Sequence, residues 1–287
     1  MRGKLIGYFN CIFRSQIFHC LRRTVMPITC PIDFHPLSTE EFATLDYTVM
    51  AHAFSSQRDL GSLADEIIYQ SDFFERLDGS GFNVAREVPV LVRFESFSKT
   101  YKLDLVVNDM AVYELKTVAE LTKEHLGQLL NYLLLLDIER GKLVNFRPNS
   151  VDSKFVNSPL SGSSRRCFST TKERYHGPQS LVDLIEALLS DWGTGLELPL
   201  YQQAIVHLLG GREQESVKLP MNRRGRELGN QRFHLVTADS AFRLTAFSKF
   251  PRGYSSQLSR LLRASPLDAL HWINIDYHEV TMTTIQR

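Results

Sequence analysis

The sequence lacks long apolar runs and has few cysteines. No stretch approaches the ~20 consecutive apolar residues that a membrane-spanning helix needs, so we expect no membrane partner. The four cysteines form neither a CxxC pair nor a Cys/His group with zinc-site spacing; they are Cys11, Cys20, Cys30 and Cys167. Because four cysteines among 287 residues do not make a disulfide scaffold, we expect a reducing compartment and a cytoplasmic protein.

Several enzyme motifs are also missing. The patterns GxxxxGK[ST], GxGxxG after a strand, HExxH and GxSxG do not occur. Their absence argues against kinases, nucleotide-driven motors, zinc peptidases and serine hydrolases of those types. With 33 Lys and Arg against 32 Asp and Glu, the chain as a whole is not a strongly basic protein that coats DNA.

Charge is distributed unevenly along the chain. Residues 1–25 carry five basic and no acidic side chains, residues 26–150 carry 11 basic and 19 acidic ones, and residues 151–287 carry 17 basic and 13 acidic ones. We interpret residues 1–37 as a basic N-terminal extension and favour Met26 as the true start of translation. An amphipathic basic anchor is the alternative.

The hydrophobic pattern of residues 38–147 predicts an α/β domain. Ser38 or Thr39, followed by two glutamates, is typical of a helix start, and a second helix follows Gly61. Strand-like stretches then occur at 84–94, 101–107 and 111–117, a leucine-rich helix at 122–136 and a short strand at 141–146. Helix, three strands, helix and strand in this order indicate one α/β domain.

The remaining chain divides into two parts. Residues 148–180 are rich in Ser, Pro and Arg, so we expect a linker or long loop. Residues 181–287 predict a basic C-terminal α+β domain. Its expected helices are 181–189, 201–209 and 254–263, and its expected strands are 233–236, 242–247, 272–275 and 280–285. This half shows no internal repeat and no repetition of the first half.

Three charged residues lie within the apolar strands of the first domain, namely Asp104, Glu114 and Lys116. A buried charge is costly unless it is paired or holds a metal. Two carboxylates on adjacent strands suit Mg²⁺ or Mn²⁺, and a lysine beside them could position a water or stabilise charge on a phosphate. The alternative is a surface hairpin with a solvated Glu–Lys pair, which simple alternation would also produce.

The order of these motifs resembles a known family. Asp104-x9-Glu114-x-Lys116, preceded by a helix with an acidic residue and followed by a helix with a glutamine, resembles the PD-(D/E)XK nuclease superfamily. Residues 61–69, GSLADEIIY, resemble the signature of the GxxExxY proteins, as do His125-x2-Gln128 and the segment 143–146 further on. The chain departs from the pattern at Leu63, where that family has its naming glycine, and at Leu103, where the superfamily often has proline.

The resemblance implies a restriction-endonuclease-like core over residues 38–147 and a set of site residues. Asp104 and Glu114 would be metal ligands, with the Leu115 carbonyl as a further ligand, and Lys116 would orient the attacking water. Glu66 could hold a metal through water, or could be an ordinary exposed helix residue. Gln128 could bind water or phosphate, or could be a surface amide. For the neighbouring His125 we favour hydrogen bonding over a role as a base.

These expectations lead to a functional hypothesis. We expect a metal-dependent nuclease that hydrolyses phosphodiester bonds, with DNA as the favoured nucleic-acid partner and Mg²⁺ or Mn²⁺ as the cofactor. Short basic runs could contact phosphates, and they comprise Arg165, Arg166, Arg223, Arg224 and Arg226. A catalytically silent nuclease-fold module is the alternative, and a homodimer is an open option.

The hairpin between residues 101 and 117 allows a geometric prediction. If a two-residue turn at Asn108-Asp109 joined the strands, Asp104 would lie opposite Tyr113, and Glu114 would point to the other face of the sheet. A three-residue connection through Met110, or a bulge, would place Asp104 opposite Glu114. A shared metal site therefore predicts an odd-length connection or a bulge.

Overall fold

We describe the protein from a computed structural model, which covers residues 27–210 and 216–287. Most of the predicted N-terminal extension, including Met26, lies outside the described residues. Its last part contains the short strand β1 (Ile28–Thr29), which pairs with the edge of the first sheet. Within the described ranges no helix combines the length and apolar character needed to cross a bilayer.

The first sheet has six strands in the order β1-β2-β3-β4-β5-β6. The strands after β1 are β2 (Val84–Phe94), β3 (Phe97–Val107), β4 (Ala111–Lys116), β5 (Arg140–Asn145) and β6 (Asp152–Asn157). Neighbours pair antiparallel except β4 and β5, which pair in parallel. We call residues 27–157 the N-terminal unit.

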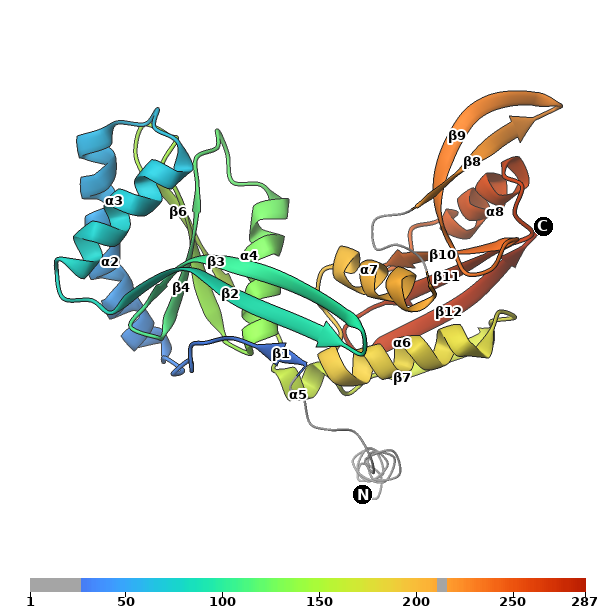
Figure 1. The fold of residues 1–287 in the computed structure, drawn as a ribbon, viewed down its shortest axis with the longest axis horizontal. Coiled ribbons are helices and arrows are strands. Elements are labelled where there is room, and N and C mark those ends of the chain that lie inside the picture. The colour runs from blue at the N-terminus through green and yellow to red at the C-terminus, as the bar shows by residue number, and fades with distance from the viewer. Residues whose placement is uncertain (1–26, 211–215) are drawn as a thin grey trace, which may run out of the picture.

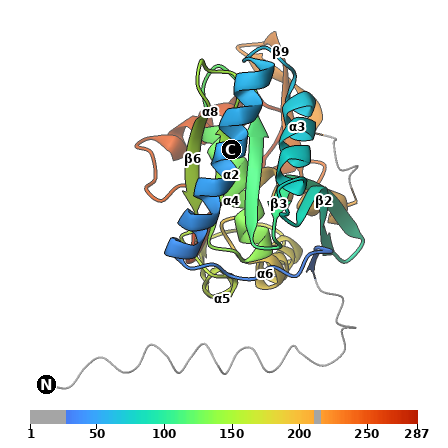
Figure 2. The ribbon, with the colours of Figure 1, turned by 90° about the vertical axis from the view of Figure 1, so that its left-hand side faces the viewer.

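Helices cover both faces of this sheet, as Figures 1 and 2 show. Helices α2 (Thr39–Leu60) and α3 (Glu66–Asp78) pack on one face, and α4 (Lys123–Leu136) lies on the other. Ser38 caps α2 in a reciprocal capping box with Glu41, which confirms the predicted helix start. The α/β core predicted from the sequence is therefore present, and both helices predicted before the strands are observed.

The second sheet has the order β7-β12-β11-β10-β9-β8. Its strands are β7 (Ser169–Arg174), β8 (Val217–Arg223), β9 (Arg226–Leu235), β10 (Ser240–Thr245), β11 (Ala269–Ile275) and β12 (Glu279–Gln286). Helices α6 (Gln179–Trp192) and α7 (Leu198–Leu208) pack on one face, and α8 (Tyr254–Ala264) packs on the other. We call residues 169–287 the C-terminal unit.

The tract 148–180, expected to be a linker or long loop, is largely ordered into elements. It contributes β6 to the first sheet and β7 to the second, with the short helix α5 (Gly162–Arg165) between them. The structure thus corrects the expectation of a linker or loop. The sequence pattern was misleading because β6 has one exposed face and β7 is an exposed edge strand. Neither strand therefore shows a clear hydrophobic pattern.

The same order of elements occurs in both units. In each, two helices precede three antiparallel strands, and a helix then crosses to a parallel strand that pairs with a final antiparallel strand. Thus β2-β3-β4-α4-β5-β6 corresponds to β8-β9-β10-α8-β11-β12. The expectation that the second half does not repeat the first is wrong at the level of topology.

The strand register makes this correspondence specific. At the hairpin tip and in the strands from β3 to β6, residues that pair in the first sheet have counterparts 129 positions later that pair in the second. Away from the tip, the β8–β9 pairing is shifted by one residue, with the shift between Met221 and Asn222. The matching pairs are Phe94↔Phe97 with Arg223↔Arg226, Leu105↔Tyr113 with His234↔Phe242, Val112↔Gly141 with Ala241↔Leu270, and Asn145↔Asp152 with Asn274↔Thr281. Because the spacing is constant from the first hairpin tip to the last strand, the two units align without insertion or deletion there.

Candidate active site

The connection between β3 and β4 has three residues. Asn108 and Asp109 adopt left-handed φ angles of 57° and 55°, and the Met110 N–H donates to the Val107 carbonyl at 3.1 Å. Leu105 pairs with Tyr113. Continuing this register by one residue places Asp104 across from Glu114. The predicted odd-length connection is confirmed.

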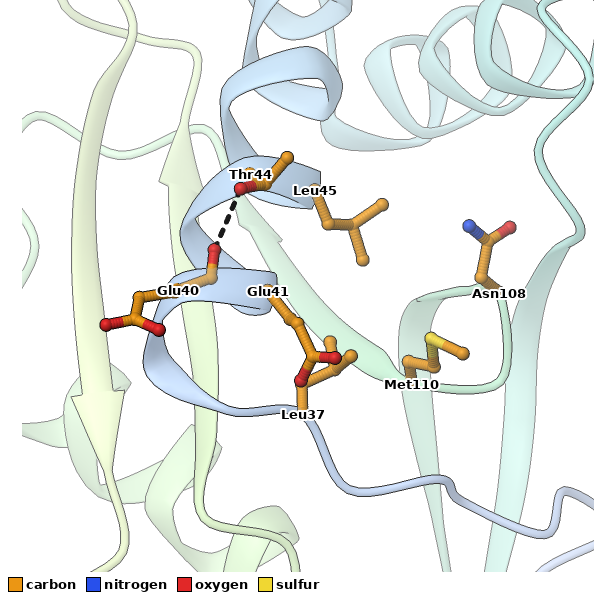
Figure 3. A pocket seen from close by; sticks show the side chains of 7 residues that line it. All are labelled: Leu37, Glu40, Glu41, Thr44, Leu45, Asn108 and Met110. Atoms are coloured by element: carbon orange, nitrogen blue, oxygen red, sulfur yellow. Dashed lines mark hydrogen bonds between the residues drawn. The ribbon is translucent and has the colours of Figure 1, made fainter.

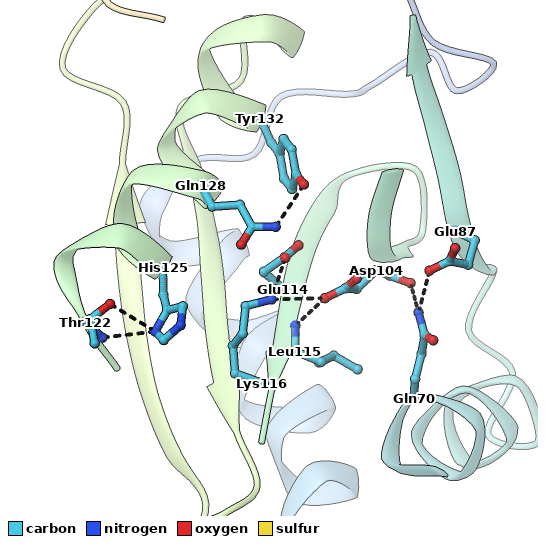
Figure 4. A network of polar contacts seen from close by, with 10 residues as sticks. All are labelled: Gln70, Glu87, Asp104, Glu114, Leu115, Lys116, Thr122, His125, Gln128 and Tyr132. Atoms are coloured by element: carbon cyan, nitrogen blue, oxygen red, sulfur yellow. Dashed lines mark hydrogen bonds and ion pairs between the residues drawn. The ribbon is translucent and has the colours of Figure 1, made fainter. Parts of the chain in front are cut away.

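The register brings three charged side chains together on the face of the sheet covered by α4 (Figure 4). Lys116 Nζ lies 2.7 Å from Glu114 Oε1 and 3.9 Å from Asp104 Oδ2. The Glu114 side chain is 1% exposed, that of Lys116 12% and that of Asp104 18%. The alternative of a solvated Glu–Lys pair on a surface hairpin does not agree with this burial.

Burial dominates the electrostatics of the site. It raises the pKa of Glu114 to about 8, the charge of Asp104 adds to the rise, and Lys116 opposes it. Burial also raises the pKa of Asp104, against the lowering effect of a hydrogen bond from the Leu115 N–H. For Lys116, burial acts to lower the pKa, but the two carboxylates together outweigh it and the pKa is raised. The site is therefore a coupled group of two acids and one base.

Asp104 lies where the β3–β4 ladder ends. The last paired residues are Leu105 and Tyr113, and beyond them Asp104 Oδ2 accepts the Leu115 N–H at 2.8 Å. The side chain thus replaces a main-chain partner, and the strands separate at this point. Since N–H and C=O of one strand residue face the same neighbour, the Leu115 carbonyl is directed to the same side.

Gln70 of α3 fixes Asp104 from the other side. Its Nε2 donates to the Asp104 carbonyl at 3.1 Å and to Glu87 Oε1 at 3.3 Å, and its side chain is buried. Glu87 has a left-handed φ of 52° within β2 and forms an ion pair with Lys102. The sequence did not identify Gln70 or Glu87, because only the pairing of β2 with β3 places them beside Asp104.

Helix α4 covers the site with polar side chains near its start. Gln128 Nε2 donates to Tyr132 Oη at 3.0 Å, and both residues lie beside Glu114 (Figure 4). His125 Nδ1 accepts the Thr122 N–H at 3.0 Å, which closes a capping box. His125 therefore makes a hydrogen bond as expected, and the absence of a role as a base stays a prediction.

Glu66 begins α3 and is partly buried. Burial raises its pKa, Lys116 lowers it and Asp104 raises it, so its carboxyl group faces the same charges. Nevertheless, within the described residues no three His, Cys, Asp or Glu side chains lie close enough together to hold a metal ion. Glu66 therefore borders the site without joining the two strand carboxylates.

The donor set nonetheless fits a hard divalent cation. Glu114 Oε2 is buried and has no hydrogen-bond partner, which leaves one carboxylate oxygen available beside Asp104. Mg²⁺ typically uses one or two protein carboxylates and keeps several waters. Asp104 and Glu114, with the Leu115 carbonyl, are suitable ligands of this kind.

The basic residues suggested by the sequence fall into two groups. Arg165 is buried, and its guanidinium donates to the carbonyls of Leu134, Trp192 and Thr194. It is a structural residue, and its predicted role in phosphate binding is wrong. Arg166 is exposed next to it. The remaining three, Arg223, Arg224 and Arg226, are exposed at the tip of the β8–β9 hairpin.

A hollow of about 430 Å³ lies elsewhere, between the start of α2 and the β3–β4 turn (Figure 3). Its lining consists of Leu37, Glu40, Glu41, Thr44, Leu45, Asn108 and Met110. These residues adjoin the beginning of β4, whereas Glu114 and Lys116 are near its end. The hollow is thus separate from the carboxylate site.

The fold and the site define the N-terminal unit as a restriction-endonuclease-like core with its charged motif at the end of the central strands. Residues 43–156 match the family model of the PD-(D/E)XK nuclease superfamily. No curated protein matches the chain. The narrower resemblance to the GxxExxY proteins stays a prediction.

Proposed function

We propose that the N-terminal unit is a metal-dependent nuclease that hydrolyses phosphodiester bonds in DNA. The observation that carries this proposal is the convergence of Asp104, Glu114 and Lys116, with one Glu114 oxygen buried and without a partner. This cluster differs from an exposed ion pair, which lies in solvent and contributes little to stability. The match of residues 43–156 to the PD-(D/E)XK nuclease superfamily model supports the same chemistry.

Each residue has a distinct part in this proposal. Asp104, Glu114 and the Leu115 carbonyl would hold Mg²⁺ or Mn²⁺. When bound, such an ion would polarise a phosphoryl oxygen and make a water more acidic. The ammonium of Lys116, 2.7 Å from Glu114, can orient the attacking water and stabilise negative charge on the phosphate.

Residues around the strands would complete the site. Gln128, which donates to Tyr132, can offer its amide oxygen to a water or its N–H to a phosphate after a small rotation. Glu66 can bind a water at the edge of the site. Gln70 acts as a positioning residue because it holds the main chain of Asp104.

A cleavage assay with matched variants tests the proposal. Asp104→Asn and Glu114→Gln should each lower DNA cleavage in Mg²⁺ or Mn²⁺ by at least about 100-fold, while circular dichroism shows an intact fold. Glu139→Gln is the control, because the Glu139 side chain is 75% exposed and forms an ion pair with the neighbouring Arg140. Cleavage at the wild-type rate by both site variants would contradict the proposal.

A further inference from the structure

The hairpin β2–β3 of the N-terminal unit ends in an arm that docks on the C-terminal unit. Phe94 and Phe97 at its tip are 3% and 1% exposed, and their rings lie 6.0 and 5.9 Å from that of Trp192 in α6. Trp192 Nε1 also donates to the Arg93 carbonyl at 2.9 Å. This arm joins the two units through apolar contacts.

The corresponding arm of the C-terminal unit, β8–β9, has a two-residue turn at the same position and the opposite chemistry. Glu95 and Arg224, the first turn residues of the two arms, both have a φ of 52°. The tip pair Phe94↔Phe97 is replaced by Arg223↔Arg226, and both arginines are exposed. The arm thus carries basic side chains where its counterpart carries buried aromatic rings.

Positive charge continues along the arm. All residues from Arg226 to Arg232 are exposed, so both faces of this part of β9 are open to solvent. Five basic side chains stand on the two strands and their turn, against one acidic side chain, Glu227. They are Lys218, Arg223, Arg224, Arg226 and Arg232.

The counterparts of the active-site residues have also changed. Phe233 stands at the position of Asp104, Arg243 at that of Glu114 and Thr245 at that of Lys116, each 129 positions later. Arg243 is exposed and donates from Nε to Tyr254 Oη at 2.9 Å. Thr245 Oγ1 donates to Asn274 Oδ1 at 2.8 Å and accepts from Trp272 Nε1 at 2.8 Å. These three positions of the C-terminal unit contain no carboxylate pair, and the guanidinium of Arg243 stands where the N-terminal unit has the carboxylate of Glu114.

We infer that the C-terminal unit is a non-cleaving copy of the nuclease fold whose β8–β9 arm binds the phosphate backbone of duplex DNA. The inference rests on the proposed function for its choice of ligand. It extends that function by assigning substrate binding to a unit that lacks the cleavage residues. Figure 1 shows the arm and the loop leading into α4 on the same upper side of the molecule.

The shape and charge of the arm favour a B-form duplex. The major groove of B-DNA admits a two-stranded β-ribbon, whereas the deep, narrow major groove of an RNA duplex does not. A planar guanidinium binds two phosphate oxygens at once, and the tip presents three of them. Residues 26–150, with 11 basic and 19 acidic side chains, are poorly suited to attract DNA, so a separate basic arm supplies what they lack.

Equilibrium binding without divalent metal tests the inference. Fluorescence anisotropy of a labelled DNA duplex, titrated with the full chain in EDTA over a range of salt concentrations, gives the affinity and its salt slope. Arg223→Ala with Arg226→Ala should weaken binding about tenfold or more and lower the slope by about 2, since each phosphate contact contributes about 0.9. Arg224 is left in place so that the residue at the left-handed position of the turn is unchanged.

The matched control removes two exposed arginines elsewhere, Arg58 and Arg93, and should keep both affinity and slope. Equal affinity of the arm variant and the wild type would overturn the inference, as would an equal loss in the control. Tighter binding of an RNA duplex than of DNA would overturn the choice of groove. DNA binding that depends on the arm, without any cleavage in metal, would overturn the proposed function and leave the arm standing. Cleavage that depends on Asp104, together with DNA binding that does not depend on the arm, would overturn the inference about the arm and leave the proposed function standing.

Discussion

Asn145 and Asn274 occupy equivalent positions and make the same contacts. Asn145 Nδ2 donates to the Val118 carbonyl at 2.8 Å, and its Oδ1 accepts the Val118 N–H at 3.0 Å. Asn274 makes the same pair of hydrogen bonds to Phe247, at 3.0 and 2.8 Å. Asn145 is the last residue of β5 and Asn274 the last but one of β11, and each holds the segment that leaves the neighbouring parallel strand, β4 or β10. The repeat therefore extends to the hydrogen bonds of single side chains.

This equivalence predicts a paired result for Asn145→Ala and Asn274→Ala. Both side chains are buried, so each substitution leaves main-chain groups without partners and should cost about 2–4 kcal/mol. Only Asn145→Ala should also lower DNA cleavage, because Val118 follows Lys116 by two residues. Urea unfolding and cleavage rates, measured well below both unfolding temperatures, check this.

The paired design contains its own control. Asn274→Ala has the same chemistry and a comparable stability loss, so it reports the effect of destabilisation alone. Equal loss of cleavage in both variants would show that the Asn145 contacts do not specifically position the active-site strand.

Arg165 gives a second prediction, about the junction between the units. Its Nε and Nη2 donate to the carbonyls of Thr194 and Trp192, both at 2.7 Å, and Nη1 donates to that of Leu134. Arg165→Met should lower the free energy of unfolding by about 3 kcal/mol or more, since buried acceptors would lose their donors. Arg166→Met, at an exposed neighbour, should stay within about 0.5 kcal/mol of the wild type in the same denaturant titration.

The core of the N-terminal unit could be predicted because the spacing of its apolar residues in the sequence agrees with their burial in the structure. Helix α4 repeats leucines at helical spacing, and Leu129 and Leu133 are fully buried. The charged residues Asp104 and Glu114 were recognisable because they interrupt apolar strands, and the need for them to share a face predicted the three-residue connection.

Other features depend on contacts that the sequence does not display. Strand β8 contains Pro220 and has no consistently buried face, so its sequence shows no strand period. The repeat was missed because counterparts such as Glu114 and Arg243 differ in charge while sharing a register position. The sequence suggests that Arg165 is a surface residue, since the carbonyls that accept its hydrogen bonds come from two separate segments, the end of α4 and the end of α6 with the residues after it.

The stability of the metal-free protein should fall as the pH rises. Burial raises the pKa of Glu114 from 4.5 to about 8, so the folded state holds this proton more tightly than the unfolded state does. The resulting stabilisation is fully present below pH ~4.5 and is lost as the pH passes through about 8. In EDTA, the unfolding temperature should drop by about 5 °C between pH 5 and pH 9.

Glu114→Gln is the informative variant for this effect, because glutamine keeps the shape and cannot titrate. Its unfolding temperature should depend less on pH over this range than that of the wild type. Glu139→Gln, at an exposed carboxylate, should follow the wild type. Parallel pH profiles for all three proteins would show that Glu114 does not carry the raised pKa.

The last prediction separates metal holding from catalysis at Lys116. Its ammonium lies 2.7 Å from Glu114 Oε1 and 3.9 Å from Asp104 Oδ2, so it occupies the carboxylates that a divalent cation would use. Lys116→Met removes this competing charge and should increase Mn²⁺ affinity several-fold at a pH high enough to ionise both carboxylates, which lies above that of the wild type because the lysine lowers the pKa of Glu114. DNA cleavage should nevertheless fall by about 100-fold or more, because the ammonium group that orients the attacking water is lost. Calorimetric titration with Mn²⁺ and cleavage assays on the same samples test both parts, with Lys102→Met as the control at an exposed lysine. If Lys116→Met bound Mn²⁺ more weakly, the lysine would be supporting the metal site and not competing with it.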